Sequence, residues 1–245
     1  MKAIEIFELD EKRILSQLQV MDVYFICLMS ALRGEEIPRD NIYKIINRPV
    51  ISGFNLFEQL YKEDDYEYLK KNEKVRYAGQ QIILSTYTAI ETYFVGKFSE
   101  YFRFKLINSD TSITERLLKN ISPRSLKDIK KNYSEYLNIQ LPCFDVDYFS
   151  QTKCNFHPED SWTGLLLIAN ARNDVAHKGS TEMYMTTTPM DCWYPFEFVR
   201  NYVRHFEANF DDYFYAGRKT RLIKLYEEKV NQRKGSLYSN GAEIN

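Results

Sequence analysis

The stretch ILSTYTAIETYFVGKFSEY, residues 83–101, decides the fold that this sequence predicts. Its apolar and aromatic residues recur at steps of four and three, the period of one face of an α-helix. They are Ile83, Tyr87, Ile90, Phe94, Phe98 and Tyr101. Because so long an apolar face has to be covered by other elements, we expect this segment to be the central helix of a bundle.

The same helical period recurs through the rest of the chain. Only 9 Gly and 7 Pro interrupt the 245 residues, and no alternating strand pattern recurs between them. In the first part of the chain, further helices are expected at 14–32, with a stop at Gly34, and at 42–47 and 53–61. In the second part, one helix is expected to begin at Ser122–Pro123 and run to Leu137, and another to run from a cap at Asp160 or Ser161 to Gly179. A last helix is expected at 196–210. The sequence therefore predicts an all-α fold, an antiparallel helical bundle with an additional N-terminal helical segment.

Three regions are expected along the chain. Residues 1–70 form an N-terminal helical extension, and residues 71–217 form the helical bundle. Residues 218–245 form a basic C-terminal helix with a flexible tail.

Composition narrows the class of protein. Apolar residues make up 44% and aromatic residues 15% of the chain, which is the composition of a folded protein with a real core. The longest apolar stretch, 23–32, is about half the length that a membrane-spanning helix requires, so no membrane association is expected. The four cysteines form no CxxC pair and no apolar signal opens the chain, which favours a cytoplasmic protein.

The net charge of the chain neither requires nor excludes a nucleic-acid partner. Because 33 Lys and Arg stand against 34 Asp and Glu, RNA would have to be held by a local basic patch. Residues 218–234 offer one, with seven positive and two negative side chains. The candidate RNA-binding residues there are Arg218, Lys219, Arg221 and Lys224. The alternative reading of this segment is an ordinary solvated helix face.

The segment LIANARNDVAHKGS, residues 167–180, carries the candidate chemistry. On a helix, Arg172 falls in the line of the apolar residues Leu165, Ile168, Ala169, Val175 and Ala176. An unpartnered guanidinium is costly to bury, so we expect Arg172 either to reach out along its stem or to meet an anion. Asn173 and His177 are four residues apart, close enough for the amide to orient the ring, and Gly179 ends the helix just beyond.

Arginine and histidine suit the cleavage of RNA. The RNA 2′-hydroxyl lies beside the scissile phosphate, so cleavage needs a base, an acid and a cation but no metal. His177 can act as base or acid near neutral pH, and Arg172 can bind phosphate oxygens in a fork. The expected products are a 2′,3′-cyclic phosphate and a 5′-hydroxyl. A homodimer would bring two such pairs together and supply both acid and base.

The spacing itself is not selective, because the pattern R-N-x-x-x-H occurs twice. Arg200, Asn201 and His205 repeat it in the middle of a helix, whereas the first copy lies at a helix end. We expect Arg200 on the polar side of its helix. His205 is expected to be half-buried against Phe198 and Tyr202.

The segment ARNDVAHKG resembles the R-x(4–6)-H signature of HEPN-domain proteins, and LSTYTAIETYF resembles their other recurrent helix. In that second helix an acidic residue faces the active-site pair, and here it is Glu91. The resemblance covers about residues 75–215. It implies a helical bundle, a homodimer with a composite site, and metal-independent endoribonuclease activity, often in a toxin, RNA-targeting or phage-defence setting.

Within that resemblance Glu91 would pair with Arg172 and direct its guanidinium; the alternative is a solvated carboxylate at the helix border. Lys178 would add phosphate attraction, or simply complement the helix dipole. Cys154 and His157 form a C-x-x-H, but Cys143 and Cys192 lie at spacings that match no common zinc pattern. No metal and no cofactor are therefore expected.

Two rival functions remain. The chain could be a catalytically inactive HEPN-like module that binds RNA or a protein. It could also be an antitoxin or regulatory subunit whose first 70 residues hold a partner protein.

Overall fold

The computed structural model describes residues 2–34, 73–107, 109–123, 125–143, 156, 158–179 and 189–214. Within these ranges the regular elements are helical and no β-strand occurs, so the predicted all-α fold is confirmed. They are α1 (Ala3–Arg33), α5 (Glu73–Lys105), α6 (Thr111–Ile121), α7 (Leu126–Asn132), the π-helical turn η1 (Tyr133–Leu137), α9 (Ser161–Lys178) and α10 (Pro189–Ala208). The helices expected at 42–47, 53–61 and 218–234 lie outside the described residues.

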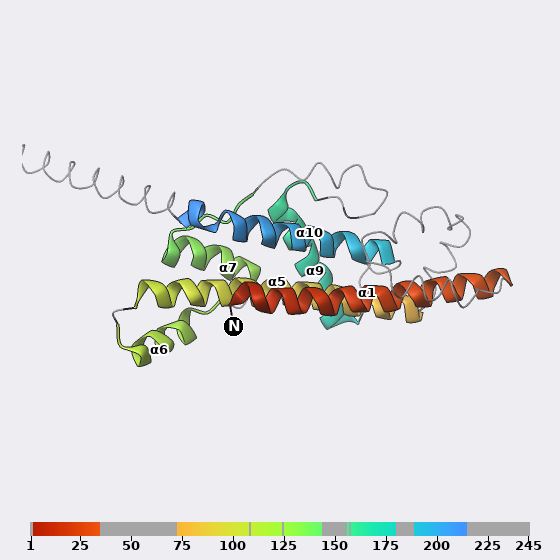
Figure 1. Cartoon of the computed structure of the whole chain (residues 1–245), viewed down its shortest axis with the longest axis horizontal. Helices are drawn as coiled ribbons and strands as arrows, with labels where there is room; N and C mark the ends of the chain where they lie inside the picture. The colour runs from red at the N-terminus through yellow and green to blue at the C-terminus, as the bar shows by residue number, and fades with distance from the viewer. Residues whose placement is uncertain are drawn as a thin grey trace, which may run out of the picture.

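Three long helices form the body of the molecule. α5 runs back along α1 in the opposite direction, and α10 lies beside them along the same axis (Figure 1). α1 ends where the sequence predicts, at Gly34, whose φ of 65° places it in the left-handed region that glycine adopts without strain. None of the helices in the described ranges has the apolar length that crossing a bilayer requires.

The predicted apolar face of α5 forms the centre of the core. Ile83, Ile90, Phe94 and Phe98 are fully buried, and Tyr87 is nearly so. Around Phe94 the aromatic rings meet edge to face, an arrangement that adds to the energy of burial alone. The rings in this cluster are Tyr93, Phe94, Tyr133, Tyr202 and Phe206. The core therefore joins α5 to η1 and α10.

The region after α5 differs from the sequence prediction. α6 was not expected; Asp110 caps it by accepting hydrogen bonds from the backbone of its first turn. Ser122 was expected to begin a helix, but it ends α6 instead, and Pro123 follows as it commonly does after a helix end. The N-cap of the next helix, α7, is Ser125, whose hydroxyl accepts a hydrogen bond from the backbone N–H of Asp128 at 3.2 Å. The Ser122 prediction was wrong because a serine before proline also suits the end of a helix.

α1 packs into the same core as α5 and α10. Phe7, Ile14 and Phe25 are buried, and Phe7 meets Tyr93 of α5 edge to face. Glu11 of α1 reaches two arginines of α10, which are described below. The described part of the N-terminal extension thus shares the core of the bundle, while the boundary at residue 70 stays a prediction.

Candidate functional site

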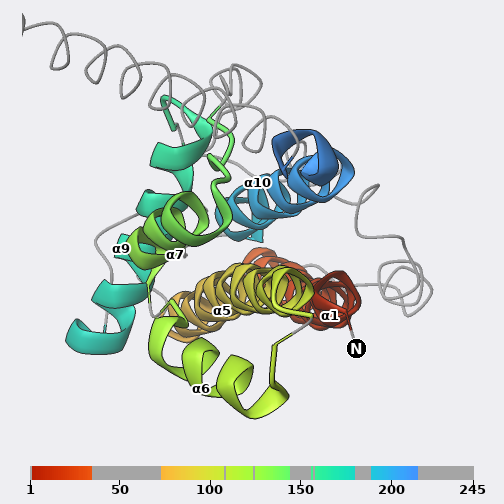
Figure 2. The ribbon, with the colours of Figure 1, turned by 90° about the vertical axis from the view of Figure 1, so that its left-hand side faces the viewer.

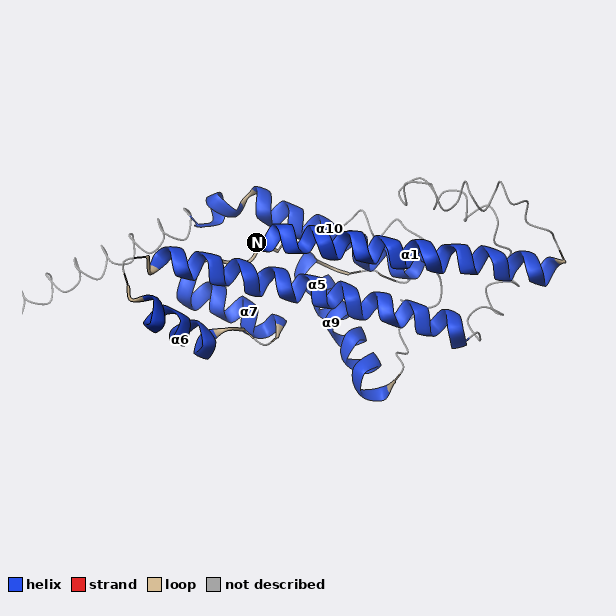
Figure 3. Ribbon diagram, turned by 60° about the horizontal axis from the view of Figure 1, so that its bottom comes forward, coloured by secondary structure: helices blue, strands red, loops and turns tan. Residues whose placement is uncertain are grey.

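α9 is held at both ends by residues that the sequence singled out. Asp160 accepts a hydrogen bond from the backbone N–H of Thr163 at 2.7 Å, so it is the N-cap, and Gly179 ends the helix with a φ of 68°. The helix crosses the long axis of the bundle, and its carboxyl end projects beside α5 (Figure 2, Figure 3). The last turn, which carries His177, therefore lies at the edge of the molecule.

Arg172 lies on the side of α9 that meets α5. Its guanidinium carbon is 5.3 Å from the centroid of the Tyr87 ring, within cation–π range. Its Nη1 donates a hydrogen bond to the side-chain oxygen of Asn173 at 3.0 Å. Within the described part of the chain, no carboxylate forms an ion pair with Arg172. Arg172 is half-buried, so its stem crosses the apolar face while its charge remains available.

The buried face of α9 is rotated slightly from the predicted one. Leu165, Ile168, Ala169 and Val175 are buried as expected. Ala176 was expected in that line but is exposed, whereas Ala171 is completely buried. The prediction for Ala176 was wrong because α9 leaves the body of the bundle near its carboxyl end.

Tyr87 joins Arg172 to Glu91. Its hydroxyl donates a long hydrogen bond to the Glu91 carboxylate, at 3.4 Å, and its ring contacts the Arg172 guanidinium. Burial raises the pKa of the Tyr87 hydroxyl above its ordinary value of 10.0, Glu91 raises it further, and the Arg172 cation opposes both. The phenol therefore stays protonated at neutral pH. The direct ion pair of Glu91 with Arg172 that the resemblance implies is not among the contacts of the described residues, where both side chains contact Tyr87 instead.

His177 and Lys178 lie in the exposed last turn of α9. The amide oxygen of Asn173, which was expected to orient the His177 ring, accepts from Arg172 instead. Lys178 forms an ion pair with Asp174 at 2.9 Å, one turn back on the same helix. The imidazole is thus open to solvent at the helix end, where a substrate or a second protein can reach it.

Comparison with protein families places this site in a known domain. The sequence model described as RiboL-PSP-HEPN matches residues 52–212, about two thirds of the chain. The chain belongs to the RiboL-PSP-HEPN family. No match was found among curated proteins or among solved structures. The HEPN match includes α5, α6, α7, η1, α9 and α10, and therefore both helices that meet at Tyr87 and Arg172; α1 precedes it.

The second R-N-x-x-x-H copy of this HEPN protein has a different environment. Arg200 was expected on the polar side of its helix, but it is buried, with its Nη2 at 2.6 Å from Glu197 and its Nη1 at 3.7 Å from Glu11. The prediction was wrong because α1 brings Glu11, far away in the sequence, against α10. His205 was expected to be half-buried but is exposed, and its Nε2 lies 3.0 Å from the Tyr213 hydroxyl. Arg200 is therefore part of a buried ion cluster that attaches α1 to α10.

Several predicted residues fall outside the described part of the HEPN protein. They are Cys154, His157, Arg218, Lys219, Arg221 and Lys224. Among the described cysteines, Cys27 and Cys143 are exposed, while burial raises the pKa of the Cys192 thiol. The described residues contain no group of three or more His, Cys, Asp or Glu side chains placed to hold a metal ion.

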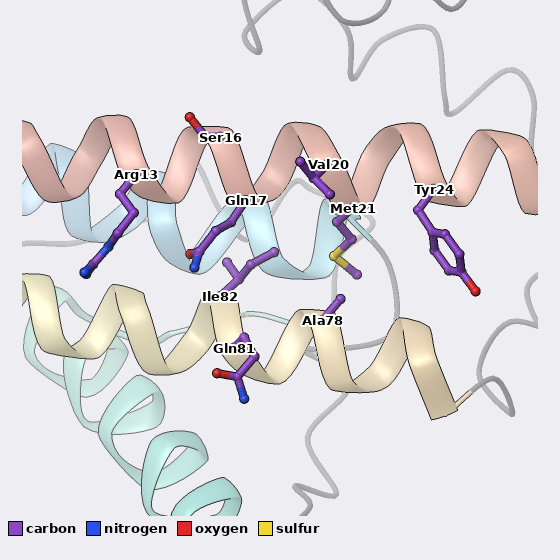
Figure 4. A pocket seen from close by; sticks show the side chains of 9 residues that line it. All are labelled: Arg13, Ser16, Gln17, Val20, Met21, Tyr24, Ala78, Gln81 and Ile82. Carbon is purple, nitrogen blue, oxygen red and sulfur yellow. The ribbon is translucent and has the colours of Figure 1, made fainter.

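The HEPN protein also has a groove of about 560 Å³ between α1 and α5. Val20 and Met21 of α1 face Ala78 and Ile82 of α5 across it (Figure 4). α1 and α9 lie on opposite sides of α5, so this groove is separate from the Arg172 site (Figure 2). Its lining is mostly apolar, and it offers no cluster suited to acid–base chemistry.

Proposed function

We propose that this HEPN protein is a metal-independent endoribonuclease, with His177 as general acid or base and Arg172 as the cation that stabilises the transition state. The observation that carries the proposal is the set of contacts that the Arg172 guanidinium makes. Its guanidinium is held by a ring and an amide, without an ion pair to a carboxylate in the described residues, and it lies on the same helix as an exposed histidine. A phosphate is the natural counter-charge for such an arginine.

The reaction follows from the chemistry of RNA. A histidine removes the proton of the 2′-hydroxyl, and the 2′-oxygen attacks the adjacent phosphorus. The bond from phosphorus to the 5′-oxygen of the next nucleotide breaks, and that oxygen takes a proton from an acid. Arg172 stabilises the added negative charge on the phosphate oxygens. The products are a 2′,3′-cyclic phosphate and a 5′-hydroxyl, and no step requires a metal.

A second copy of the chain completes the site. Positions five apart on an α-helix point in directions that differ by about 140°, so one α9 does not aim Arg172 and His177 the same way. One histidine also cannot act as both base and acid in a single step. The exposed carboxyl end of α9 can meet its equivalent across a two-fold axis, so that two histidines and two arginines surround one phosphodiester. We infer a homodimer for this reason.

The cellular role that fits this activity is that of a toxin or phage-defence effector acting on RNA in the cytoplasm. Lys178 would add attraction for phosphate near the cleaved bond, and Arg218, Lys219, Arg221 and Lys224 would extend the contact along the strand. A protein antitoxin or regulator would then be expected to control the activity.

The test is incubation of the purified full-length protein with defined RNAs and a chelator. Fragments that end in a 2′,3′-cyclic phosphate and begin with a 5′-hydroxyl support the proposal. RNA substrates with a 2′-deoxy nucleotide at the cleaved position should resist, because they lack the attacking hydroxyl. RNA that is bound but stays intact under all conditions would favour the rival function, an inactive HEPN-like binding module.

A further inference from the structure

We propose that Tyr87 is a positioning residue of the Arg172 site, which fixes the direction of the guanidinium while leaving its charge free for the substrate. The proposal rests on the endoribonuclease function proposed above. Tyr87 belongs to the predicted apolar face of α5, and the sequence pattern alone gives it a role in the core. Its contacts give it a second role.

Two contacts define this role, one on each end of the side chain. The face of the ring supports the Arg172 guanidinium, with 5.3 Å between the guanidinium carbon and the ring centroid. The hydroxyl donates to Glu91, one helical turn further along α5. Because only 6% of Tyr87 is exposed, packing restricts its ring to one orientation. A fixed ring in turn restricts where the longer and more mobile arginine side chain can lie.

A ring holds an arginine in a way that a carboxylate does not. The guanidinium has five N–H donors in its plane, and a carboxylate occupies two of them and neutralises the charge. An aromatic face attracts the cation through its quadrupole and accepts none of those in-plane hydrogen bonds strongly. In the described contacts Arg172 donates one hydrogen bond, to the side chain of Asn173, and its positive charge is not neutralised by a carboxylate. The site thus supplies a directed cation for phosphate.

Arg200 provides the comparison within the same chain. It occupies the equivalent position in the second R-N-x-x-x-H copy and also lies over an aromatic ring, with its guanidinium carbon 5.5 Å from the Trp193 ring. Two carboxylates, Glu197 and Glu11, nevertheless approach it directly. Arg200 is consequently neutralised and structural, whereas Arg172 is supported by a ring without such an ion pair. The two arginines differ in what the neighbouring carboxylate contacts: Glu197 and Glu11 approach Arg200 directly, whereas Glu91 accepts a hydrogen bond from the Tyr87 hydroxyl.

Glu91 acts on Arg172 through Tyr87 in this arrangement. Its carboxylate accepts the phenol hydrogen bond, which helps to fix the ring, and it contributes negative potential without a direct ion pair. Replacing Glu91 by glutamine keeps an acceptor for the phenol and removes the charge. Replacing Tyr87 by phenylalanine keeps the ring and removes the hydroxyl. Leucine at position 87 removes both while staying apolar.

The kinetic test compares these variants on one defined RNA, using the full-length protein. Tyr87→Phe should cleave within about threefold of the wild type, whereas Tyr87→Leu should lose about tenfold or more in kcat with KM changed by less than about threefold. This split is expected because a misdirected cation weakens transition-state binding more than ground-state binding. Circular dichroism and thermal melting establish that each variant is folded.

A spectroscopic measurement tests the contact independently of cleavage. A guanidinium over a ring face has its Nε–H proton signal shifted upfield by the ring current, and Arg172→Lys identifies that signal by removing it. The shift should persist in Tyr87→Phe and disappear in Tyr87→Leu. This readout needs only enough folded Tyr87→Leu protein for a spectrum. If the leucine variant does not fold, an unshifted Arg172 signal in the wild type still overturns the proposal.

The two hypotheses fail in different ways. A wild-type protein that cleaves no RNA overturns the proposed function, and the catalytic meaning of Tyr87 falls with it. A wild type that does cleave, combined with a folded Tyr87→Leu variant of unchanged kcat, overturns the positioning role alone. The positioning role is also overturned if Tyr87→Phe loses as much activity as Tyr87→Leu, because the ring would then not be what matters.

Discussion

Gly164 of α9 lies directly against the ring of Phe198 in α10. A β-carbon built on Gly164 would come within 2.7 Å of Cε1 of Phe198 and closer still to Cζ, distances that real contacts do not show. The two helices approach this closely because position 164 has no side chain. Since α9 carries Arg172 and His177, the contact contributes to the orientation of the candidate site.

Replacing Gly164 by alanine should therefore destabilise the protein. Alanine gains about 1 kcal/mol in helix propensity over glycine, but forcing a methyl group into a packed ring typically costs about 1–3 kcal/mol or more. Phe198 is buried among other core residues and has little room to move, so we expect the packing cost to exceed the gain. The measurement is the free energy of unfolding in urea. Gly96→Ala is the control, since a β-carbon built there would lie 3.1 Å from the Ala3 β-carbon, a smaller overlap that should destabilise the protein less. A Gly164→Ala protein as stable as the wild type would contradict the close approach.

The ion cluster between α1 and α10 gives a second prediction. The Glu11 and Arg200 side chains are each only 10% exposed, so Glu11→Ala would leave Arg200 buried with Glu197 as its remaining carboxylate partner in the described contacts. Breaking a buried pair so that the other charge is left unpaired costs about 3 kcal/mol or more, and because Glu197 still pairs with Arg200 we expect a smaller loss here. We expect a clear fall in the denaturation midpoint. Glu115→Ala is the matched control, because its ion pair with Arg103 is half exposed and should leave the midpoint unchanged.

Local patterns predicted the elements of this fold well. The apolar faces of α5 and α9, the stops at Gly34 and Gly179, and the cap at Asp160 are all set by neighbours within a turn or two of the chain. A periodic apolar stripe fixes which face is buried almost regardless of what covers it. For this reason the sequence predicts helices more readily than their partners.

Long-range contacts could not be predicted in the same way. The sequence around Arg200 is that of a surface residue. The cost of burying its charge is offset in part by Glu11 of α1, which is far away in the sequence. The α6 helix was missed although its sequence carries a local signal, an N-cap at Asp110 and apolar residues at a helical period. For Arg200 the deciding neighbour is distant in sequence, and for Ser122–Pro123 the local signal has two meanings, so the pair was assigned to the wrong helix.

The candidate site, like the fold, could be predicted from the sequence only in part. The position of Arg172 in an apolar line is visible in the sequence, as is an acidic residue on the facing helix. The contact of Tyr87 with both Arg172 and Glu91 is not visible in the sequence, because a tyrosine in an apolar stripe resembles any other aromatic residue of the core. One signal was present: Tyr87 and Glu91 are one helical turn apart within the segment that resembles the second HEPN helix. The catalytic roles of Arg172 and His177 stay predictions.

The cap of α9 gives a pH-dependent prediction. The backbone N–H of Thr163 holds the pKa of the Asp160 carboxyl below its ordinary value of 3.8. A carboxyl with a lowered pKa in the folded state stabilises the protein above that ordinary value, and this contribution is lost as the pH falls through the folded pKa. Asp160→Ala should cost about 1 kcal/mol at pH 7, the usual worth of an N-cap, and less in acid below pH 4 or so.

Urea unfolding of the wild type and Asp160→Ala across pH 3 to 7 measures this difference. Asp160→Asn is the control, since asparagine caps helices without ionising, and its stability relative to Asp160→Ala should not vary with pH in this window. A constant gap between the wild type and Asp160→Ala at every pH would mean that the ionised carboxylate is not the capping group.

The two histidines of the repeated motif provide the sharpest test of the proposed activity. His177→Ala should lower RNA cleavage by about a hundredfold or more, the usual contribution of a general acid or base. His205→Ala should cleave within about threefold of the wild type, because its ring contacts Tyr213 and its motif arginine is neutralised by Glu197 and Glu11. Both histidines are exposed and both end the same R-N-x-x-x-H pattern, so the pair controls for sequence, charge and solvent access. Equal activity of the two variants, measured on one RNA at one pH with both proteins shown to be folded, would remove His177 from the reaction.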